Sequence, residues 1–121
     1  MKKGLLLLGI MVGIALAGMT SAGLVRAQAA PRRIEVTAKR FEFAPGEITV
    51  KKGEPVVLVL HSMDVAHGLR FRELNVDVKV PAGGTSEVLF TPEKTGDFTG
   101  HCSVFCGSGH GGMMLTLHVV D

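Results

Sequence analysis

From residue 33 onward the sequence is a succession of short apolar segments that end at Gly or Pro. Ile34, Val36 and Ala38 alternate with polar residues, as expected of a strand with one buried face. Val56–Leu60 is a continuous aliphatic run, which is typical of a central strand covered on both faces. Further strands are expected at 48–51, 76–80, 86–90, 97–102 and 115–120. Short strands with frequent turns predict an all-β sandwich or barrel, without a helix of useful length.

The first 29 residues have the layout of a secretory signal. Two lysines precede a long apolar run, and Ala27-Gln28-Ala29 offers a small-x-small cleavage pattern. Cleavage after Ala29 would leave a single exported domain, residues 30–121. The alternative is an uncleaved anchor, because about 20 apolar residues suffice to span a bilayer. We expect a periplasmic or other extracytoplasmic location, with membrane contact only if residues 5–25 remain attached.

The positive formal charge of the whole chain comes largely from this N-terminal segment. Without Lys2, Lys3 and Arg26, the thirteen Lys and Arg fall to ten, against eleven Asp and Glu. The remaining domain is nearly neutral and has no basic run longer than a pair. The composition therefore excludes a nucleic-acid footprint.

One segment does not fit a strand. It reads Cys102-Ser-Val-Phe-Cys106-Gly-Ser-Gly-His110-Gly-Gly-Met113. Two thiolates, an imidazole and a thioether fall within twelve residues, and its glycines let the backbone curl closely around a ligand. A long glycine-rich loop between two strands is usually functional. Thiolate and thioether ligands select soft metals such as copper, and a Met beside Cys and His favours copper over structural zinc.

His67 can complete this ligand set from the loop after the Val56–Leu60 strand. It lies in the segment Asp64-Val65-Ala66-His67-Gly68. Ligands drawn from two loops at one end of a sandwich would form a rigid site, because the strands hold both loops. Asp64 is a candidate to orient the imidazole of His67, although a role in the turn is an equal alternative.

The pattern Cys-x-x-x-Cys-x-x-x-His-x-x-Met, with an upstream Asp-Val-x-His, resembles the binuclear copper domain called CuA. That domain occurs in cytochrome c oxidase subunit II and in nitrous oxide reductase, on a cupredoxin fold. The resemblance covers roughly residues 56–120. It implies a Greek-key β-sandwich with the metal-ligand loops at one end, two copper ions, and one-electron transfer between periplasmic donor and acceptor proteins.

The resemblance also implies a role for each ligand. Cys102 and Cys106 would bridge both copper ions, and His67 and His110 would be terminal ligands. Met113 and the backbone carbonyl of Val104 would be weak ligands. The protein would be an electron carrier, or an accessory component of a terminal oxidase or reductase, and not itself an enzyme. Oxidase subunit II carries an aromatic cluster close to CuA where electrons enter, whereas this chain contains no Trp and no Tyr. Its docking surface is therefore expected to differ from that of oxidase subunit II.

Three other interpretations stay open. The two cysteines could form a disulfide, the usual state in an exported protein. A single blue copper could use one Cys with His67, His110 and Met113, which would leave Cys102 as a spare thiol. The protein could also store copper or deliver it to an enzyme.

Apart from Phe105, a candidate to shield the metals, and His61, whose role stays open, the remaining aromatic, histidine and methionine residues are expected to be structural. His101 should point away from Cys102, its neighbour on a strand, and His118 should also face outward. Met63 and Met114 are expected to pack and not to bind metal. The core is expected to contain five phenylalanines: Phe41, Phe43, Phe71, Phe90 and Phe98.

Overall fold

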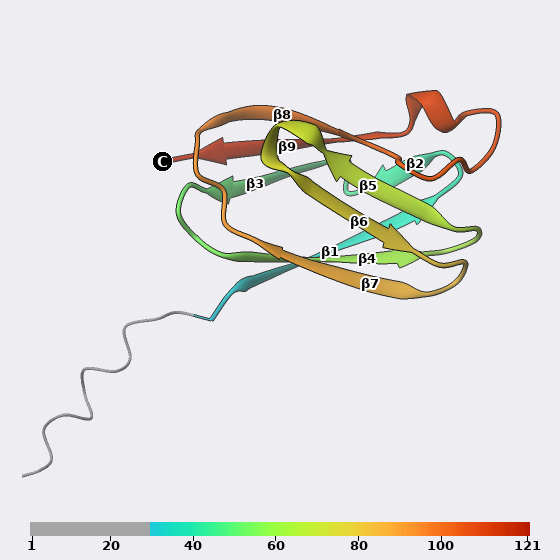
Figure 1. Ribbon diagram of the computed structural model, residues 1–121, viewed down its shortest axis with the longest axis horizontal. Coiled ribbons are helices and arrows are strands. Elements are labelled where there is room, and N and C mark those ends of the chain that lie inside the picture. The colour runs from blue at the N-terminus through green and yellow to red at the C-terminus, as the bar shows by residue number, and fades with distance from the viewer. Residues whose placement is uncertain (1–29) are drawn as a thin grey trace, which may run out of the picture.

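Residues 30–121 are described by the computed structural model, so the expected signal segment 1–29 lies outside the described residues. The described chain forms two β-sheets packed face to face (Figure 1). The alternating segments predicted a sandwich, because each such strand has one apolar face that must be covered. The all-β prediction is confirmed.

The first sheet has the strand order β2-β1-β4-β7 and the second has the order β3-β9-β8-β5-β6. The pairs β1–β4 and β3–β9 are parallel, and the other neighbouring pairs are antiparallel. The first sheet consists of β1 (Arg32–Lys39), β2 (Glu42–Ala44), β4 (Val56–Ser62) and β7 (Thr85–Phe90). The second consists of β3 (Glu47–Lys51), β5 (His67–Phe71), β6 (Val76–Val80), β8 (Gly96–His101) and β9 (Met114–Val120). Two single-turn 3₁₀ helices are η2 (Arg72–Leu74) and η3 (His110–Gly112).

The apolar core lies between the two sheets and follows the predicted periodicity. In β9 the inward residues Leu115, Leu117 and Val119 are buried, and they alternate with more exposed neighbours. Strand β4 lies between β1 and β7 and is mostly buried, as its continuous aliphatic run predicts. This core supports the loops at both ends of the sandwich.

Several sequence expectations about single elements are wrong. The sequence predicts a loop after β4 as far as Gly68, but His67 is already the first residue of strand β5. Phe41 is 37% exposed and occupies the turn between β1 and β2, so it is not a core residue. Met63 and Met114 are 66% and 47% exposed and do not pack in the core.

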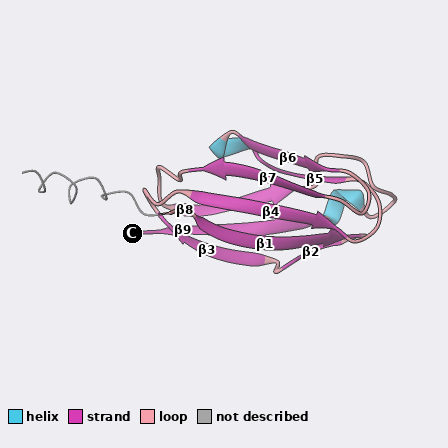
Figure 2. Cartoon of the chain, turned by 90° about the horizontal axis from the view of Figure 1, so that it is seen from below, coloured by secondary structure: helices cyan, strands magenta, loops and turns pink. Residues whose placement is uncertain are grey.

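The two segments that carry the predicted ligands lie at the same end of the sandwich. They are the start of β5, which follows the β4–β5 loop, and the long β8–β9 loop, which includes η3 (Figures 1 and 2). Strand β1 begins and β9 ends at the opposite end (Figure 1). None of the helices in residues 30–121 has the length and apolar character required to cross a membrane.

His118 lies on the outer face of the second sheet, as predicted, between two carboxylates from neighbouring strands. Its Nδ1 lies 2.7 Å from Asp97 Oδ1, and its Nε2 lies 2.7 Å from Glu47 Oε1. The hydrogen bonds to Asp97 and then to Glu47 raise the pKa of His118 above its usual value. Protonated His118 can donate from both ring nitrogens, so it joins β8, β9 and β3.

Replacing His118 by Gln is expected to remove a pH-dependent part of the stability. Because the folded pKa is raised, this part is fully present below the unfolded pKa of about 6.5 and is lost as the pH rises through the folded value. Urea denaturation of wild type and variant should therefore differ more at pH 5 than at pH 9. An equal difference between wild type and H118Q at both pH values would contradict this assignment.

Candidate metal centre

The five predicted ligand side chains come together at one end of the sandwich. His67 opens β5, Cys102 directly follows β8, and Met113 directly precedes β9. Cys106 and His110 lie in the loop between β8 and β9. Three of the five are therefore attached at strand ends, where the sheet fixes their backbone positions.

The two thiols lie side by side in the centre of this group. Cys102 Sγ and Cys106 Sγ are 3.7 Å apart, whereas a disulfide bond is about 2.05 Å long. Both cysteines are buried, and both are free thiols. The disulfide interpretation is therefore not the state of this structure.

The other predicted ligands surround the two sulfur atoms. His67 Nδ1 lies 3.9 Å from Cys102 Sγ, and His110 Nδ1 lies 3.6 Å from Cys106 Sγ. Met113 Sδ lies 3.7 Å from Cys106 Sγ, and the carbonyl oxygen of Val104 lies 3.2 Å from Cys102 Sγ. Each thiol therefore has an imidazole nitrogen and one weaker donor beside it.

Asp64 determines which nitrogen of His67 faces the thiols. Asp64 Oδ1 accepts a hydrogen bond of 2.7 Å from His67 Nε2, so Nδ1 is left to face Cys102. The His67 side chain is completely buried, so its ring has little freedom to turn. A carboxylate that fixes the tautomer and orientation of a ligating imidazole is a common support of metal sites.

Asp64 also organises the β4–β5 loop, so both roles considered for this residue are present. Its carboxylate accepts hydrogen bonds from the backbone N–H of Arg40 at 2.9 Å and of Val65 at 2.7 Å. The Arg40 N–H, followed by His67, lowers the pKa of Asp64 to about 2. Buried Ser62 extends the network, because its hydroxyl donates to the carbonyl of Val65 and accepts from Asp64 N–H.

The β1–β2 turn supports the β8–β9 loop, a contact that sequence reasoning missed. Arg40 Nε donates a 2.9 Å hydrogen bond to the carbonyl oxygen of Cys106. The ring of Phe41 lies against Gly107 and Gly109, where a Cβ atom would approach it to 2.9 and 2.5 Å. Gly107 also has a φ of +136°, which side chains rarely adopt. Glycine is therefore required where the loop crosses Phe41.

Replacing Gly109 by Ala is expected to destabilise the fold by about 1–3 kcal/mol, because overpacking forces neighbouring groups to shift. The new Cβ would lie 2.5 Å from Phe41 Cδ2 and 2.6 Å from its Cγ. Gly109 has a φ of −91°, so backbone strain does not contribute. Chemical denaturation of the variant measures the cost.

Two further variants test the cause of this loss. Gly111→Ala is the matched control and should be nearly neutral, because a Cβ added at Gly111 would have no neighbouring atom within 4 Å. In the double variant Phe41→Ala/Gly109→Ala, the added cost of the Gly109 change should disappear. If that cost persists without the Phe41 ring, the steric explanation is wrong.

The raised pKa of Cys106 indicates what kind of ligand the site would hold. Burial, followed by the hydrogen bond with Cys102, raises the pKa of Cys106 to about 11. Two adjacent buried thiolates would repel each other unless a cation lay between them. His67, Cys102 and Cys106 place their donor atoms within 4.8 Å of one another. The donor set and its burial therefore fit a soft metal cation, and thiolate, imidazole and thioether together indicate copper.

Comparison with known proteins identifies the family. The sequence model of the cupredoxin-like domain matches residues 8–115. The chain belongs to the cupredoxin-like domain family. This cupredoxin is 34% identical over 88 residues to cytochrome c oxidase subunit 2 of Thermus thermophilus, a match that covers 73% of the chain and 65% of that protein. It is 31% identical over 81 residues to nitrous-oxide reductase of Cupriavidus necator, covering 64% and 13% respectively.

A solved structure shows the same fold. The periplasmic domain of subunit II of cytochrome oxidase from Bradyrhizobium japonicum superposes with a TM-score of 0.69 at 22% identity, covering 78% of this chain and 87% of that one. The cupredoxin-like sandwich is therefore confirmed, as is the resemblance to oxidase subunit II and nitrous-oxide reductase. The chain spans less than two thirds of the length of the two curated relatives.

Proposed function

We propose that this cupredoxin is a one-electron carrier with a binuclear CuA-type copper centre. The observation that carries the proposal is the pair of buried thiols, 3.7 Å apart, with an imidazole nitrogen beside each. The proposed ligands are the side chains of His67, Cys102, Cys106, His110 and Met113, and the carbonyl oxygen of Val104. Two copper ions bridged by both thiolates would share one exchanged electron between them.

The protein contributes a largely buried and preorganised set of ligands to this chemistry. Met113 and His67 are completely buried, and the two cysteines are nearly so. Asp64 accepts a hydrogen bond from His67 Nε2, and Arg40 Nε donates one to the carbonyl oxygen of Cys106, so both ligand segments are held. A site whose ligands are already in place reorganises little when its charge changes, which favours rapid electron transfer. Met113, as a weak ligand, and the burial of the sulfur atoms would tune the reduction potential of the copper centre.

The position of both thiols favours two bridged ions over a single blue copper. In a mononuclear site Cys102 would be spare, yet its sulfur is buried beside His67 and the Val104 carbonyl. The hydrogen bonds that hold His67 and the β8–β9 loop favour a carrier over a copper-delivery protein, because delivery requires ligands that release their metal. One-electron exchange is therefore the use that fits this arrangement best.

The location and partners follow from the same proposal. We propose that residues 1–29 direct export, and that residues 30–121 act outside the cytoplasm between a donor and an acceptor protein. The carrier would serve a terminal oxidase or reductase, in line with the relatives. Intact-mass analysis of the exported protein tests the cleavage, because retention of residues 1–29 would indicate an anchor.

Voltammetry of the copper-loaded protein on an electrode tests the proposed carrier function. We expect one reversible one-electron wave whose shape persists over repeated cycles. The Cys102→Ser/Cys106→Ser double variant, treated with copper in the same way, is the control and should give no such wave. If the wild type gives no reversible wave, or releases its copper rapidly to a Cu(I) chelator, the carrier function is wrong and copper handling is favoured.

A further inference from the structure

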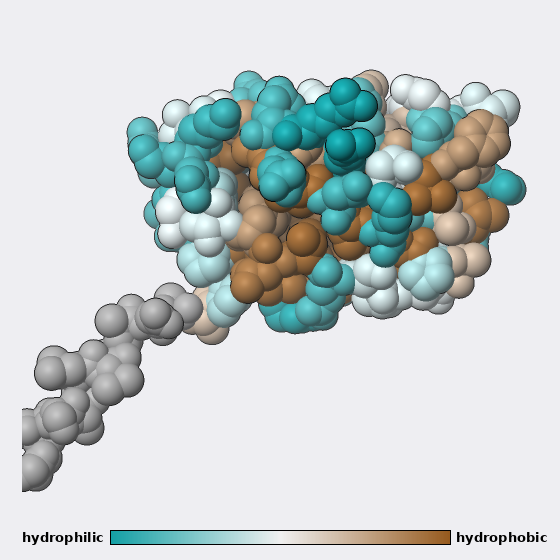
Figure 3. Space-filling view, viewed as in Figure 1, coloured by the Kyte–Doolittle hydropathy of each residue, from teal (hydrophilic) through white to brown (hydrophobic). Residues whose placement is uncertain are grey.

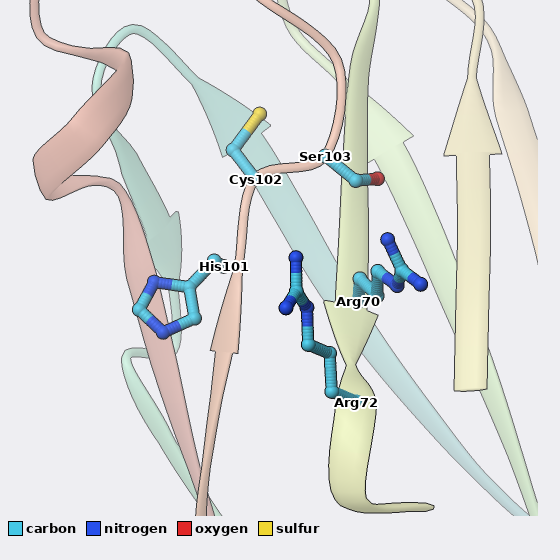
Figure 4. Close-up of a pocket in the computed structure, with 5 residues that line it drawn as sticks. All are labelled: Arg70, Arg72, His101, Cys102 and Ser103. Atoms are coloured by element: carbon cyan, nitrogen blue, oxygen red, sulfur yellow. The ribbon is translucent and has the colours of Figure 1, made fainter. Parts of the chain in front are cut away.

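A cleft on the outer face of the second sheet adjoins the proposed copper centre. Its volume is about 480 Å³, and it is lined by Arg70, Arg72, His101, Cys102 and Ser103. Figure 4 shows the guanidinium group of Arg72 between β5 and the strand end that carries His101 and Cys102, and the guanidinium group of Arg70 on the other side of β5, toward Ser103. In Figure 3, strongly hydrophilic side chains gather over β5 and β8. We call this feature the basic cleft.

The two guanidinium groups of the basic cleft form no ion pair within residues 30–121, although Arg70 lies close enough to Asp77 to act on it electrostatically. Arg70, Arg72 and His101 form no ion pair there, whereas three other histidines each contact a carboxylate. The acidic residue nearest in register is Asp77, opposite Arg70. Asp77 is already bound by Lys79 at 3.1 Å and by the Ser103 hydroxyl at 3.1 Å. The cleft therefore keeps a net positive charge on a domain that is nearly neutral overall.

The basic cleft is connected to the proposed centre by the backbone. Arg70 pairs with His101 across β5 and β8, and His101 pairs with Met114 across β8 and β9. His101, the last residue of β8, and Met114, the first residue of β9, are exposed. Each is followed or preceded in the chain by a buried proposed ligand: Cys102 follows His101, and Met113 precedes Met114. A partner seated at the cleft would therefore be one residue away from two ligands.

We propose that the basic cleft docks an acidic surface of a redox partner protein. The choice of partner rests on charge complementarity: unpaired arginines on a concave surface favour carboxylate groups, which guanidinium binds with two parallel hydrogen bonds. The surrounding potential would also steer such a partner toward the end of the molecule where the ligands lie. This inference rests on the proposed electron-transfer function for its purpose, but the charge preference of the cleft can be tested separately.

Binding is tested without copper, using a hexaglutamate peptide as the probe. In the ¹⁵N-labelled protein at low salt, amide shifts are expected at residues 70–72 and 101–103. The variant Arg70→Gln/Arg72→Gln should lose them. The matched control is Lys51→Gln/Lys52→Gln, which removes the same charge from exposed lysines at the opposite end, beside Val120. Shifts that survive in R70Q/R72Q, or that disappear equally in K51Q/K52Q, would overturn the proposal.

Electron transfer is tested on the copper-loaded reduced protein with two oxidants of opposite charge. At low salt, R70Q/R72Q should be oxidised by ferricyanide about tenfold more slowly than wild type, whereas K51Q/K52Q should change less than about twofold. The cationic tris(phenanthroline)cobalt(III) should not be slowed by either change. Equal ferricyanide rates in all three proteins would overturn docking at the cleft and leave the carrier function standing. A failure to hold copper would defeat the carrier function, and the peptide titration would still decide the charge preference.

Discussion

Replacing Cys106 by Ser is expected to reduce bound copper from two ions per chain to at most one and to abolish the purple colour of a shared-electron centre. The thiol of Cys106 lies 3.7 Å from Cys102 Sγ, 3.6 Å from His110 Nδ1 and 3.7 Å from Met113 Sδ. Serine is a hard oxygen donor that does not replace a soft bridging thiolate. Metal analysis and the visible spectrum of the reconstituted protein measure the loss.

Cys102→Ser is the matched variant, and it separates the two possible copper arrangements. In a bridged site both sulfur atoms hold both ions, so C102S should be as damaging as C106S. In a mononuclear site Cys102 is spare, and C102S would bind copper as the wild type does. A C102S variant with unchanged copper content and spectrum would therefore contradict the bridged arrangement.

Replacing Asp64 by Ala is expected to weaken copper binding by about 10- to 100-fold, the usual effect of losing a carboxylate that orients a ligand imidazole. The change leaves Nε2 of the buried His67 without its acceptor, which costs about 1–3 kcal/mol of stability. It also removes the acceptor for the N–H of Arg40 and Val65. Competition with a copper chelator measures the affinity, and chemical denaturation measures the stability.

Asp64→Asn is the conservative comparison for this prediction. The amide oxygen can still accept from His67 Nε2, but the amide NH₂ would face the Arg40 N–H, so two donors would meet. We expect its copper affinity to fall between those of the wild type and D64A. Asp97→Ala, whose carboxylate contacts His118 on the outer face of the sheet, should leave copper affinity unchanged. Equal copper affinity in wild type and D64A would show that the hydrogen bond from His67 to Asp64 is not required to orient the imidazole for copper binding.

The strands and the ligand types could be predicted because they depend on local patterns. A period of two identifies the buried face of β9, and a continuous run identifies β4 as central. Four of the five ligand side chains occur within twelve residues, so their spacing is visible in the sequence. His67 lies 35 residues before Cys102 and was predicted by its side-chain type and loop position.

The supports of the site could not be predicted, because they depend on contacts between distant segments. Arg40 and Cys106 are 66 residues apart, and nothing local marks their hydrogen bond. A period of two that runs on to Phe41 predicts a core residue there, whereas Phe41 lies in a turn and packs on the glycines of the ligand loop. Strand β5 is not among the predicted strands, and the close approach of the ligand loop to it is also non-local: a Cβ at Gly68 would meet Ser103 Oγ at 2.2 Å.

The central claim, a binuclear copper centre, is tested most directly by electron paramagnetic resonance. The protein is first reduced to keep Cys102 and Cys106 as thiols, then loaded with copper and brought to the one-electron-oxidised state. One unpaired electron shared equally by two copper nuclei should give a seven-line hyperfine pattern with two ions bound per chain. A four-line pattern with one ion per chain would contradict the claim and establish a mononuclear site.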